Sequence, residues 1–275
     1  MTERYVDLHL HTNHSDGSDS PTRVVERAAE AGLAAMAITD HDTVSAIPEA
    51  AEAAAQHGIE FLPGVEVSSK LGRNEVHILG LGVDPGPGPL ADALEQQAEG
   101  RRNRADRIVA KLKKLGVSVD TDALAQKTAD GVVGRMHIAK EIVASGHARS
   151  VQDAFDKFIK SGRPAYVPKD ALTVAQAVDL IHAARGLAIV AHPGLGGLHA
   201  RFDELFAHPF DGLEAHHSRH SQGQAQRFVE IARERNMVIS GGSDCHGTIK
   251  GEAPLMGSVR VPYAIYENLK NALAA

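Results

Sequence analysis

The sequence predicts an α/β fold: a distorted (β/α)7 barrel, TIM-like, that carries an inserted helical subdomain. Short apolar runs alternate with Ala-rich helical segments, seven such runs can be counted, and a polar cluster ends each of them. Barrels of this kind gather their functional groups at the rim formed by the strand ends. An open doubly wound sheet is the alternative, but it would concentrate ligands at one switch point, and no G-x-G-x-x-G motif follows the first run.

The elements follow a regular order through the first 83 residues. A strand is expected over 4–10 and a helix over 20–33, with Ser20 or Thr22 as its cap, Pro21 in its first turn and Gly32 at its end. The next β-like runs, which surround one further helix, cover 34–40, 59–68 and 75–83. This order is typical of a parallel sheet.

A segment rich in proline and glycine interrupts the order at 84–89, and the sequence from about Leu90 to Phe158 predicts helices only. We therefore expect a barrel domain formed by residues 1–88 and 165–275, and a helical subdomain formed by residues 89–164. The barrel pattern then resumes, with β-like runs at 187–193, 211–217 and 237–244 and a final helix after Pro262.

The composition is that of a globular protein with an ample core, since 43% of the 275 residues are hydrophobic. The formal net charge of -6 argues against binding to duplex DNA or to an anionic membrane, although a local basic patch can hold a small anion. One cysteine, Cys245, excludes an internal disulfide and fits a reducing compartment. With no leader-like segment and no apolar run of spanning length, we expect a cytoplasmic protein.

Histidine is the unusual residue, with 16 copies, many of them beside acidic residues where the β-like runs end. The first run ends in H-x-H, whose two imidazoles share one face of a strand and can bind one ion together. Imidazoles and carboxylates without thiolates suit an open catalytic site for manganese, iron or zinc. The candidate ligands are too many for one metal, so we expect two or three ions, with Glu66 as the bridge. They are His9, His11, Asp16, Asp40, His41, Glu66, His77, His192, Glu214, Asp244 and His246.

Other histidines, and the cysteine, do not occupy the same positions relative to the predicted strand ends. His14, His216, His217 and His220 are expected on the solvent or substrate side. Cys245 lies between two proposed ligands and should point to the opposite face of the strand, which indicates packing and not a nucleophile.

Six motifs occur along the chain in the order DLHLHTNHSDG, ITDHD, GVEVS, HILG, AHP and GGSDCHG. In this order they resemble the motifs of the PHP (polymerase and histidinol phosphatase) domain family, whose members are distorted seven-stranded β/α barrels with a multinuclear metal site. The resemblance implies one metal on His9, His11, Glu66 and Asp244, a second on Glu66, His77 and His192, and a third on Asp16, His41 and His246. Asp16 stands where some relatives carry histidine.

The insertion, with VVGRMHIAKEIVASGH and FIKSGRPAYVPK, resembles one branch of that family more closely. This branch removes the 3' phosphate of nucleoside 3',5'-bisphosphates and includes 5'-to-3' exoribonucleases on short RNA. The resemblance implies a small anionic nucleotide substrate, with short RNA ends as a second substrate and manganese as the first choice of metal. Handles for a second phosphate are expected near a helix start, at Arg135, His137 and Lys140, and also at Ser68, Ser69 and Lys169.

A phosphate ester suits such a site, because metal ions can activate a shared water and stabilise charge on the phosphoryl oxygens. We expect attack by a metal-bridging hydroxide, with Glu66, Asp244 and Asp40 as catalytic residues. The general acid is open between Asp40, His217 and a metal-bound water. A basic stripe is either a solvated helix face or a guide for a phosphate chain; it comprises Arg101, Arg104, Arg107, Lys111 and Lys114.

The predicted function is that of a metal-dependent phosphomonoesterase that converts a nucleoside 3',5'-bisphosphate, such as adenosine 3',5'-bisphosphate, to the 5'-monophosphate. The alternatives are a histidinol-phosphate or other small-molecule phosphatase, a 5'-3' exoribonuclease on short RNA, and a non-catalytic metal-binding accessory domain. The long insertion weighs against the first, and the complete set of motifs weighs against the last. An amidohydrolase with a bridging carbamate is disfavoured because no candidate lysine stands near a strand end.

Overall fold

The computed structural model describes residues 3–72, 74–125, 133–168, 172–248 and 255–275. Its centre is one sheet with the strand order β8-β7-β6-β4-β3-β2-β1-β9, and β5 pairs with β3. The strands are β1 (Tyr5–Leu10), β2 (Ala35–Ile38), β3 (Glu60–Leu71), β4 (Asn74–Leu81), β5 (Leu172–Thr173), β6 (Leu187–Val190), β7 (Gly212–His217), β8 (Val238–Gly242) and β9 (Val261–Pro262).

The sheet closes where β1 meets the end of β8. The backbone N–H of His11 donates to the carbonyl of Cys245 at 3.0 Å, and the N–H of Asp244 donates to the carbonyl of His9 at 2.9 Å. Gly242 permits this approach, because a Cβ at this position would lie 2.4 Å from the Cβ of His9. The predicted distorted barrel is confirmed, and Cys245 is buried in its core as expected.

One strand runs against the predicted direction. β4 is antiparallel to both β3 and β6, whereas β1, β2 and β3 pair in parallel, as do β6, β7 and β8. The prediction of a uniformly parallel barrel is wrong here, because only residues 72–73 separate β3 from β4, and so short a connection joins antiparallel strands. His77 therefore lies near the start of β4, and this start reaches the rim at which the parallel strands end.

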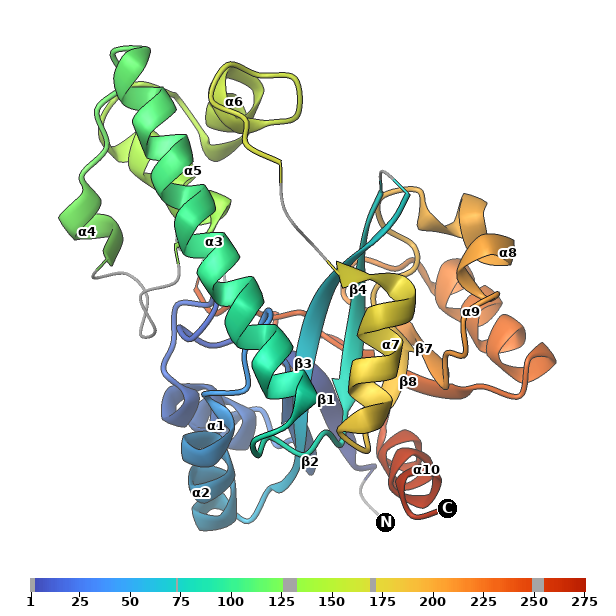
Figure 1. Ribbon diagram of the computed structural model, residues 1–275. Helices are drawn as coiled ribbons and strands as arrows, with labels where there is room; N and C mark the ends of the chain where they lie inside the picture. The colour runs from blue at the N-terminus through green and yellow to red at the C-terminus, as the bar shows by residue number, and fades with distance from the viewer. Residues whose placement is uncertain (1–2, 73, 126–132, 169–171, 249–254) are drawn as a thin grey trace.

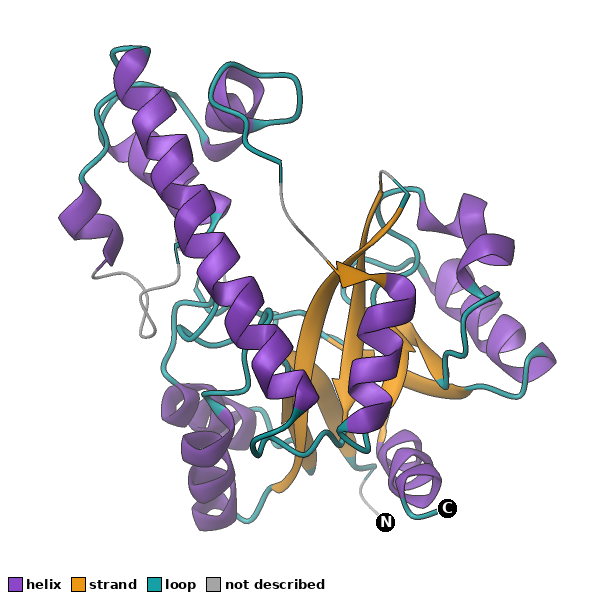
Figure 2. Ribbon diagram, in the orientation of Figure 1, coloured by secondary structure: helices purple, strands orange, loops and turns teal. Residues whose placement is uncertain are grey.

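Helices cover the outside of the barrel (Figures 1 and 2). Ser20 caps the first helix by accepting the N–H of Arg23 at 3.3 Å, and Pro21 is its first residue, as predicted. Gly32 follows the helix with a φ of 70°. The outer helices are α1 (Pro21–Glu30), α2 (Ile47–His57), α7 (Val174–Ala183), the 3-10 helix η2 (Leu198–Arg201), α8 (Phe202–Leu205), α9 (Gln222–Glu234) and α10 (Tyr263–Leu273).

The inserted segment is helical and stands beside the barrel rim (Figure 1). It consists of α3 (Pro89–Lys114), α4 (Thr121–Ala125), α5 (Arg135–Ala144), α6 (Val151–Ala154) and the π-helix η1 (Phe155–Ile159). The start of α3 packs on the barrel core through Leu90 and Leu94. Its second half packs on α5 in a separate core that contains Ile108, Leu112 and Ile138. The exact boundaries of a subdomain at 89–164 stay a prediction.

Among the helices in the described ranges, none combines the length and the apolar character that crossing a membrane requires.

Candidate active site

Four side chains converge where β1, β3 and the end of β8 meet. His9 Nε2 and His11 Nε2 lie 3.2 and 3.3 Å from the same oxygen of Glu66, Oε2. The same two nitrogens lie 3.4 and 3.1 Å from Asp244 Oδ1. The histidines and Glu66 are buried, and the Asp244 side chain is 19% exposed. Imidazole nitrogens and carboxylate oxygens that face one point form a ligand set for a divalent ion.

The second oxygen of Glu66 faces a different pair of histidines. Glu66 Oε1 lies 2.9 Å from His77 Nδ1 and 3.0 Å from His192 Nε2. Because its two oxygens point to separate groups of nitrogens, this carboxylate is placed to bridge two ions. His77 comes from the antiparallel strand β4 and His192 from the segment directly after β6.

A third group lies nearer the surface. His246 Nε2 lies 3.1 Å from Asp16 Oδ1, and His41 Nε2 lies 3.9 Å from the same oxygen. The other ring nitrogen of His41, Nδ1, lies 3.1 Å from Glu66 Oε2, so His41 stands between the outer group and the bridging carboxylate. All nine ligands that the family resemblance implies are thus brought together, while their assignment to individual ions stays a prediction.

The donor atoms in this cluster fit metal ions. Within the described residues, buried ring nitrogens without a hydrogen-bond partner include both of His11, Nδ1 of His41 and Nδ1 of His77. Buried polar atoms are almost always paired, so ring nitrogens that face carboxylates without a hydrogen bond fit the ligands of a metal ion. With nitrogen and oxygen donors and no thiolate, the set suits manganese, iron or zinc.

The charges in the cluster compensate one another. Burial opposes protonation of His11, but the carboxylates of Asp244 and Glu66 outweigh it and raise the pKa of His11 to about 10. Glu66 likewise raises the pKa of His77 to about 9 against the effect of burial. Burial lowers the pKa of His41 to about 3, so this histidine is neutral, as a metal ligand must be. Metal binding would displace the protons that the raised pKa values retain.

The backbone at the rim is bent in three places to aim these side chains. Asp42, His192 and Asp244 have positive φ angles of 52°, 29° and 57°. Positive φ is uncommon outside glycine, and such strained residues cluster at functional sites. Two of the three are predicted metal ligands, and the third accepts the N–H of Ser68 at 2.6 Å.

β7 adds two buried residues to the cluster, Glu214 and His217. The expectation that His217 faces solvent or substrate is wrong, since its side chain is buried with Nε2 3.4 Å from Asp244 Oδ2. The cause is an irregularity in the β7–β8 register between Glu214 and His216, which shifts the alternation of the strand. His217, and not His216, therefore follows Glu214 into the interior, and no feature of the sequence marks this shift.

Asp40 is buried, does not line the described pocket and holds the loop that follows β1. Its carboxylate accepts the N–H and the hydroxyl of Thr12 at 2.7 and 2.6 Å, and also the hydroxyl of Ser15. The prediction of Asp40 as a catalytic acid does not fit this arrangement, because both of its oxygens are engaged inside the protein. Asp40 anchors the loop that carries Asp16.

Ser69 also differs from its predicted role in substrate binding. Its hydroxyl donates to the carbonyl of Val76 at 2.7 Å, across the β3–β4 pair. Ser68 shares the strand face of Glu66, two residues away, and it is Ser68 that lines the pocket beside the metal-ligand cluster.

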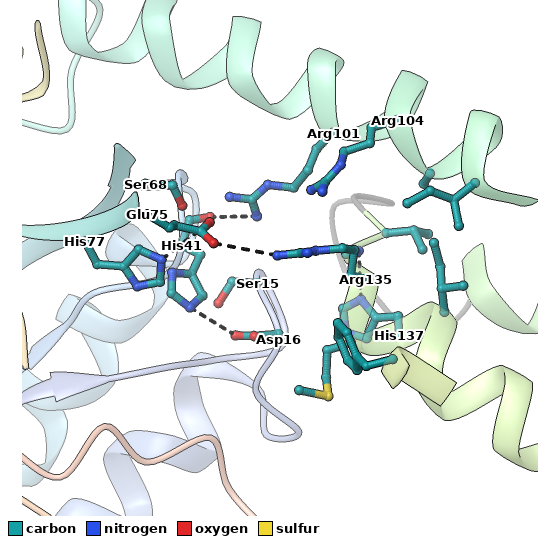
Figure 3. Close-up of a pocket in the computed structure, with 17 residues that line it drawn as sticks. Ser15, Asp16, His41, Ser68, Glu75, His77, Arg101, Arg104, Arg135 and His137 are labelled. Atoms are coloured by element: carbon teal, nitrogen blue, oxygen red, sulfur yellow. Dashed lines mark hydrogen bonds and ion pairs between the residues drawn. The ribbon is translucent and has the colours of Figure 1, made fainter. Parts of the chain in front are cut away.

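That pocket has a volume of about 300 Å³ and lies between the rim and the insertion (Figure 3). The barrel contributes Asp16, His41, Ser68, Glu75 and His77, and the insertion contributes Arg101, Arg104, Arg135 and His137. Arg135 and His137 therefore lie where the sequence predicted them. Lys140 is not among the described lining residues, and Lys169 lies outside the described residues.

The basic side chains along α3 have different partners. Arg101 forms an ion pair with Asp42, and Arg104 Nε donates to the carbonyl of Val167 at 2.9 Å. Lys111 Nζ donates to the carbonyl of Tyr166 at 2.6 Å and so holds the chain where it leaves the insertion. The sequence left the basic stripe of α3 open between a solvated helix face and a guide for a phosphate chain, because the direction in which a helix faces depends on its packing. Arg101 and Arg104 line the pocket.

The pocket wall on the insertion carries excess positive charge. Burial and then the charge of Arg135 lower the pKa of Arg104 to about 10. Within the described residues, Arg135 forms an ion pair with Glu75 at 3.6 Å. Guanidinium groups that repel one another form a site for an anion such as a phosphate.

Clustered imidazole and carboxylate ligands on a barrel rim, opposite an arginine wall, define a hydrolase of the metal-dependent phosphoesterase class. The chain matches the PHP domain family model over residues 7–240 and belongs to that family. It is 37% identical over 253 residues to the 3',5'-nucleoside bisphosphate phosphatase of Chromobacterium violaceum, covering 90% of this chain and 88% of that one.

Two further relatives agree with this class. The chain is 36% identical over 247 residues to the 5'-3' exoribonuclease Rnm of Escherichia coli, covering 87% of this chain and 84% of that one. A structure assigned as a metal-dependent phosphoesterase from Bifidobacterium adolescentis has a TM-score of 0.86 and 28% identity, covering 97% of this chain and 95% of that one. The resemblance to the bisphosphate phosphatase and exoribonuclease branch is confirmed.

Proposed function

We propose that this protein removes the 3' phosphate of nucleoside 3',5'-bisphosphates such as adenosine 3',5'-bisphosphate. One observation carries the proposal: metal-ligand candidates and arginines line opposite sides of the same pocket. A substrate with two phosphates can place one at each side. The 37% identity to a protein of that name supports the same substrate class.

The rim holds the reacting phosphate in this proposal. Two or three divalent ions, with manganese as the first choice, would be held by the three ligand groups that share or adjoin Glu66. When bound, such ions lower the pKa of water and neutralise charge on the phosphoryl oxygens. The strands fix the ligands, since the side chains are buried and Glu66 contacts histidines through both oxygens. Asp40 is assigned as the anchor of the Asp16 loop. His217 is fully buried beside Asp244, so a water remains to protonate the leaving oxygen.

The insertion holds the second phosphate. Arg104 and Arg135 are assigned to it. Arg101 is held in an ion pair with the buried Asp42, whereas Arg135 faces the exposed carboxylate of Glu75 at the longer distance of 3.6 Å. The planar guanidinium group donates two parallel hydrogen bonds to phosphate oxygens, which fixes the substrate in orientation as well as in charge. Phe155, 5.8 Å from the Arg135 guanidinium, supports that side chain from behind.

A 5'-3' exoribonuclease activity on short RNA is the second candidate. A second hollow of about 440 Å³ shares His41 and Arg101 with the first and is also lined by His14, Ser45 and Arg102. A nucleotide chain could continue into it from the reacting phosphate. The E. coli relative carries the name of this activity.

We also propose that the protein is cytoplasmic, because a single cysteine fits a reducing compartment.

The test is an assay of phosphate release and product identity. Metal-free protein is supplied with manganese and given adenosine 3',5'-bisphosphate, 3'-AMP, 5'-AMP, histidinol phosphate or a 5'-phosphorylated RNA oligomer. The proposal expects the bisphosphate to be the best substrate, with 5'-AMP as product, and activity to be lost with a chelator. Faster turnover of histidinol phosphate than of the bisphosphate would overturn the proposed substrate. Release of mononucleotides from the RNA oligomer, with no turnover of the bisphosphate, would favour the exoribonuclease.

A further inference from the structure

Glu214 lies beneath the metal-ligand cluster, is 0% exposed, and has both carboxylate oxygens engaged. Oε1 lies 2.9 Å from His9 Nδ1, and Oε2 accepts the backbone N–H of His192 at 2.7 Å. One of these partners belongs to the first ligand group and the other to the second. A single buried carboxylate, which is not among the residues that line the described pocket, therefore contacts both groups.

The contact with His9 decides which ring nitrogen carries the proton. A neutral imidazole has one N–H and one lone pair, and Glu214 can only accept, so Nδ1 must donate. The lone pair is then at Nε2, which faces Glu66 at 3.2 Å and Asp244 at 3.4 Å. The other tautomer would place an N–H where a metal ligand needs its lone pair.

The contact with His192 acts through the backbone. His192 has a φ of 29°, which costs energy for a residue with a Cβ and persists only where neighbours hold it. The N–H of His192 is fixed by Glu214, and this directs the imidazole so that Nε2 lies 3.0 Å from Glu66 Oε1.

A separate ion is the alternative explanation for this group, since donor atoms of His9, Glu214 and His217 lie within 4.8 Å of one another. Two contacts oppose this. The second oxygen of Glu214 is engaged by the N–H of His192, and His217 Nδ1 accepts the N–H of Arg219 at 3.1 Å, which leaves the proton at Nε2. The group is a hydrogen-bonded support and not a ligand set.

We propose that Glu214 is a positioning residue that controls two neighbouring metal sites at once, through the tautomer of His9 and the backbone of His192. The inference rests on the metal sites of the proposed function, but not on its substrate. Its test is therefore metal binding, which is independent of whether any phosphate ester is turned over.

The decisive variant is Glu214→Gln, which keeps the shape of the side chain. An amide has one acceptor oxygen and one NH2 group, so it can satisfy only one of the two N–H donors, and its NH2 group faces the other. Loss of such an outer partner typically costs about 10–100-fold in metal affinity. Glu214→Gln should therefore weaken the ion whose donor faces the NH2 group, and Glu214→Leu, which removes both acceptor oxygens, should weaken both ions. An ion at Asp16, His41 and His246 should keep its affinity in either variant.

Manganese affinity and stoichiometry are measured by competition with a chelator, and cobalt absorption spectra report the ligand geometry. Glu141→Gln is the matched control, because Glu141 is also a buried glutamate, 6% exposed, but lies on α5 away from the cluster. It should bind manganese as the unaltered protein does. Glu214→Asp keeps two acceptor oxygens and should recover part of the lost affinity.

Wild-type manganese affinity in Glu214→Gln would overturn the proposal, as would weakening of one ion alone in Glu214→Leu. Equal loss of all ions in step with a fall in Tm would also overturn it, because it would indicate general damage. Selective loss of two ions in Glu214→Leu with an unchanged Tm supports it. That result would stand even if adenosine 3',5'-bisphosphate proved not to be a substrate.

Discussion

The rim of the barrel and the wall of the insertion face each other across one pocket, but they are built differently (Figure 3). At the rim, buried histidines and carboxylates contact one another, and strands hold them from several directions. On the wall, arginines project from helices that pack around a core of their own. The metal-ligand candidates are thus held by the strands of the barrel, whereas the arginines come from a unit with its own core that contacts the rim through Arg101 and Asp42.

The largest effect is expected from breaking the rim with Asp244→Ala. This removes a carboxylate that faces His9 and His11 at 3.4 and 3.1 Å. Since metal ions contribute several kcal/mol to catalysis, turnover should fall by about 10³-fold or more. Steady-state kinetics with metal analysis measures this, and an active, fully loaded variant would show that the ligand group is misassigned.

The rim should also give the metal-free protein an unusual dependence of stability on pH. The pKa values of His11 and His77 rise from 6.5 to about 10 and about 9, so protonation of both stabilises the folded state below pH 6.5. This stabilisation declines as pH rises from 6.5 and is lost above the folded pKa values. Urea unfolding at pH 6, 8 and 10 should show a falling free energy of unfolding without metal and a smaller fall with manganese. Equal falls in both forms would contradict the compensation of charge described here.

Much of the rim could be predicted from the sequence, because strand ends meet at one edge and the motifs mark those ends. The direction of β4 could also have been predicted, since the six residues 69–74 between the two expected runs are too few for a crossover, and alternation with Glu66 favours Ser68 over Ser69. The burial of His217 could not be predicted from the sequence, because it depends on a register shift between β7 and β8. The inward direction of Arg104 depends on how α3 packs, which periodicity leaves undecided.

Gly242, where the barrel closes, and Gly100, on α3, differ in the space around them. Gly242→Ala would place a Cβ 2.4 Å from that of His9, where the barrel closes, whereas Gly100 of α3 has open space around it. We expect Gly242→Ala to lower the free energy of unfolding by about 1–3 kcal/mol, since strands cannot move apart freely. Gly100→Ala should raise it by about 0.5–1 kcal/mol, because alanine favours a helix. Urea denaturation of both variants tests this, and equal effects would mean that β1 and β8 are not tightly packed.

A smaller loss of turnover than in Asp244→Ala is expected at the outer edge of the rim. Asp16→Ala removes the carboxylate shared by His246 and His41, at 3.1 and 3.9 Å, and leaves the Glu66 groups intact. One ion should be lost and turnover should fall by about tenfold, equivalent to 1.4 kcal/mol, while two ions stay bound. Metal content per chain gives the answer, and loss of all ions would show that the three groups are not separable.

The most direct test of the division between rim and wall is a ratio of specificities. It is kcat/KM for adenosine 3',5'-bisphosphate divided by kcat/KM for 3'-AMP, measured for the unaltered protein, Arg135→Ala and Lys140→Ala. Lys140 is a cation of the same helix outside the pocket, and so serves as the control. A charge-assisted contact is worth about 1.5–3 kcal/mol, so the ratio should fall about 10–100-fold in Arg135→Ala alone. An unchanged ratio, or equal loss on both substrates, would contradict the account.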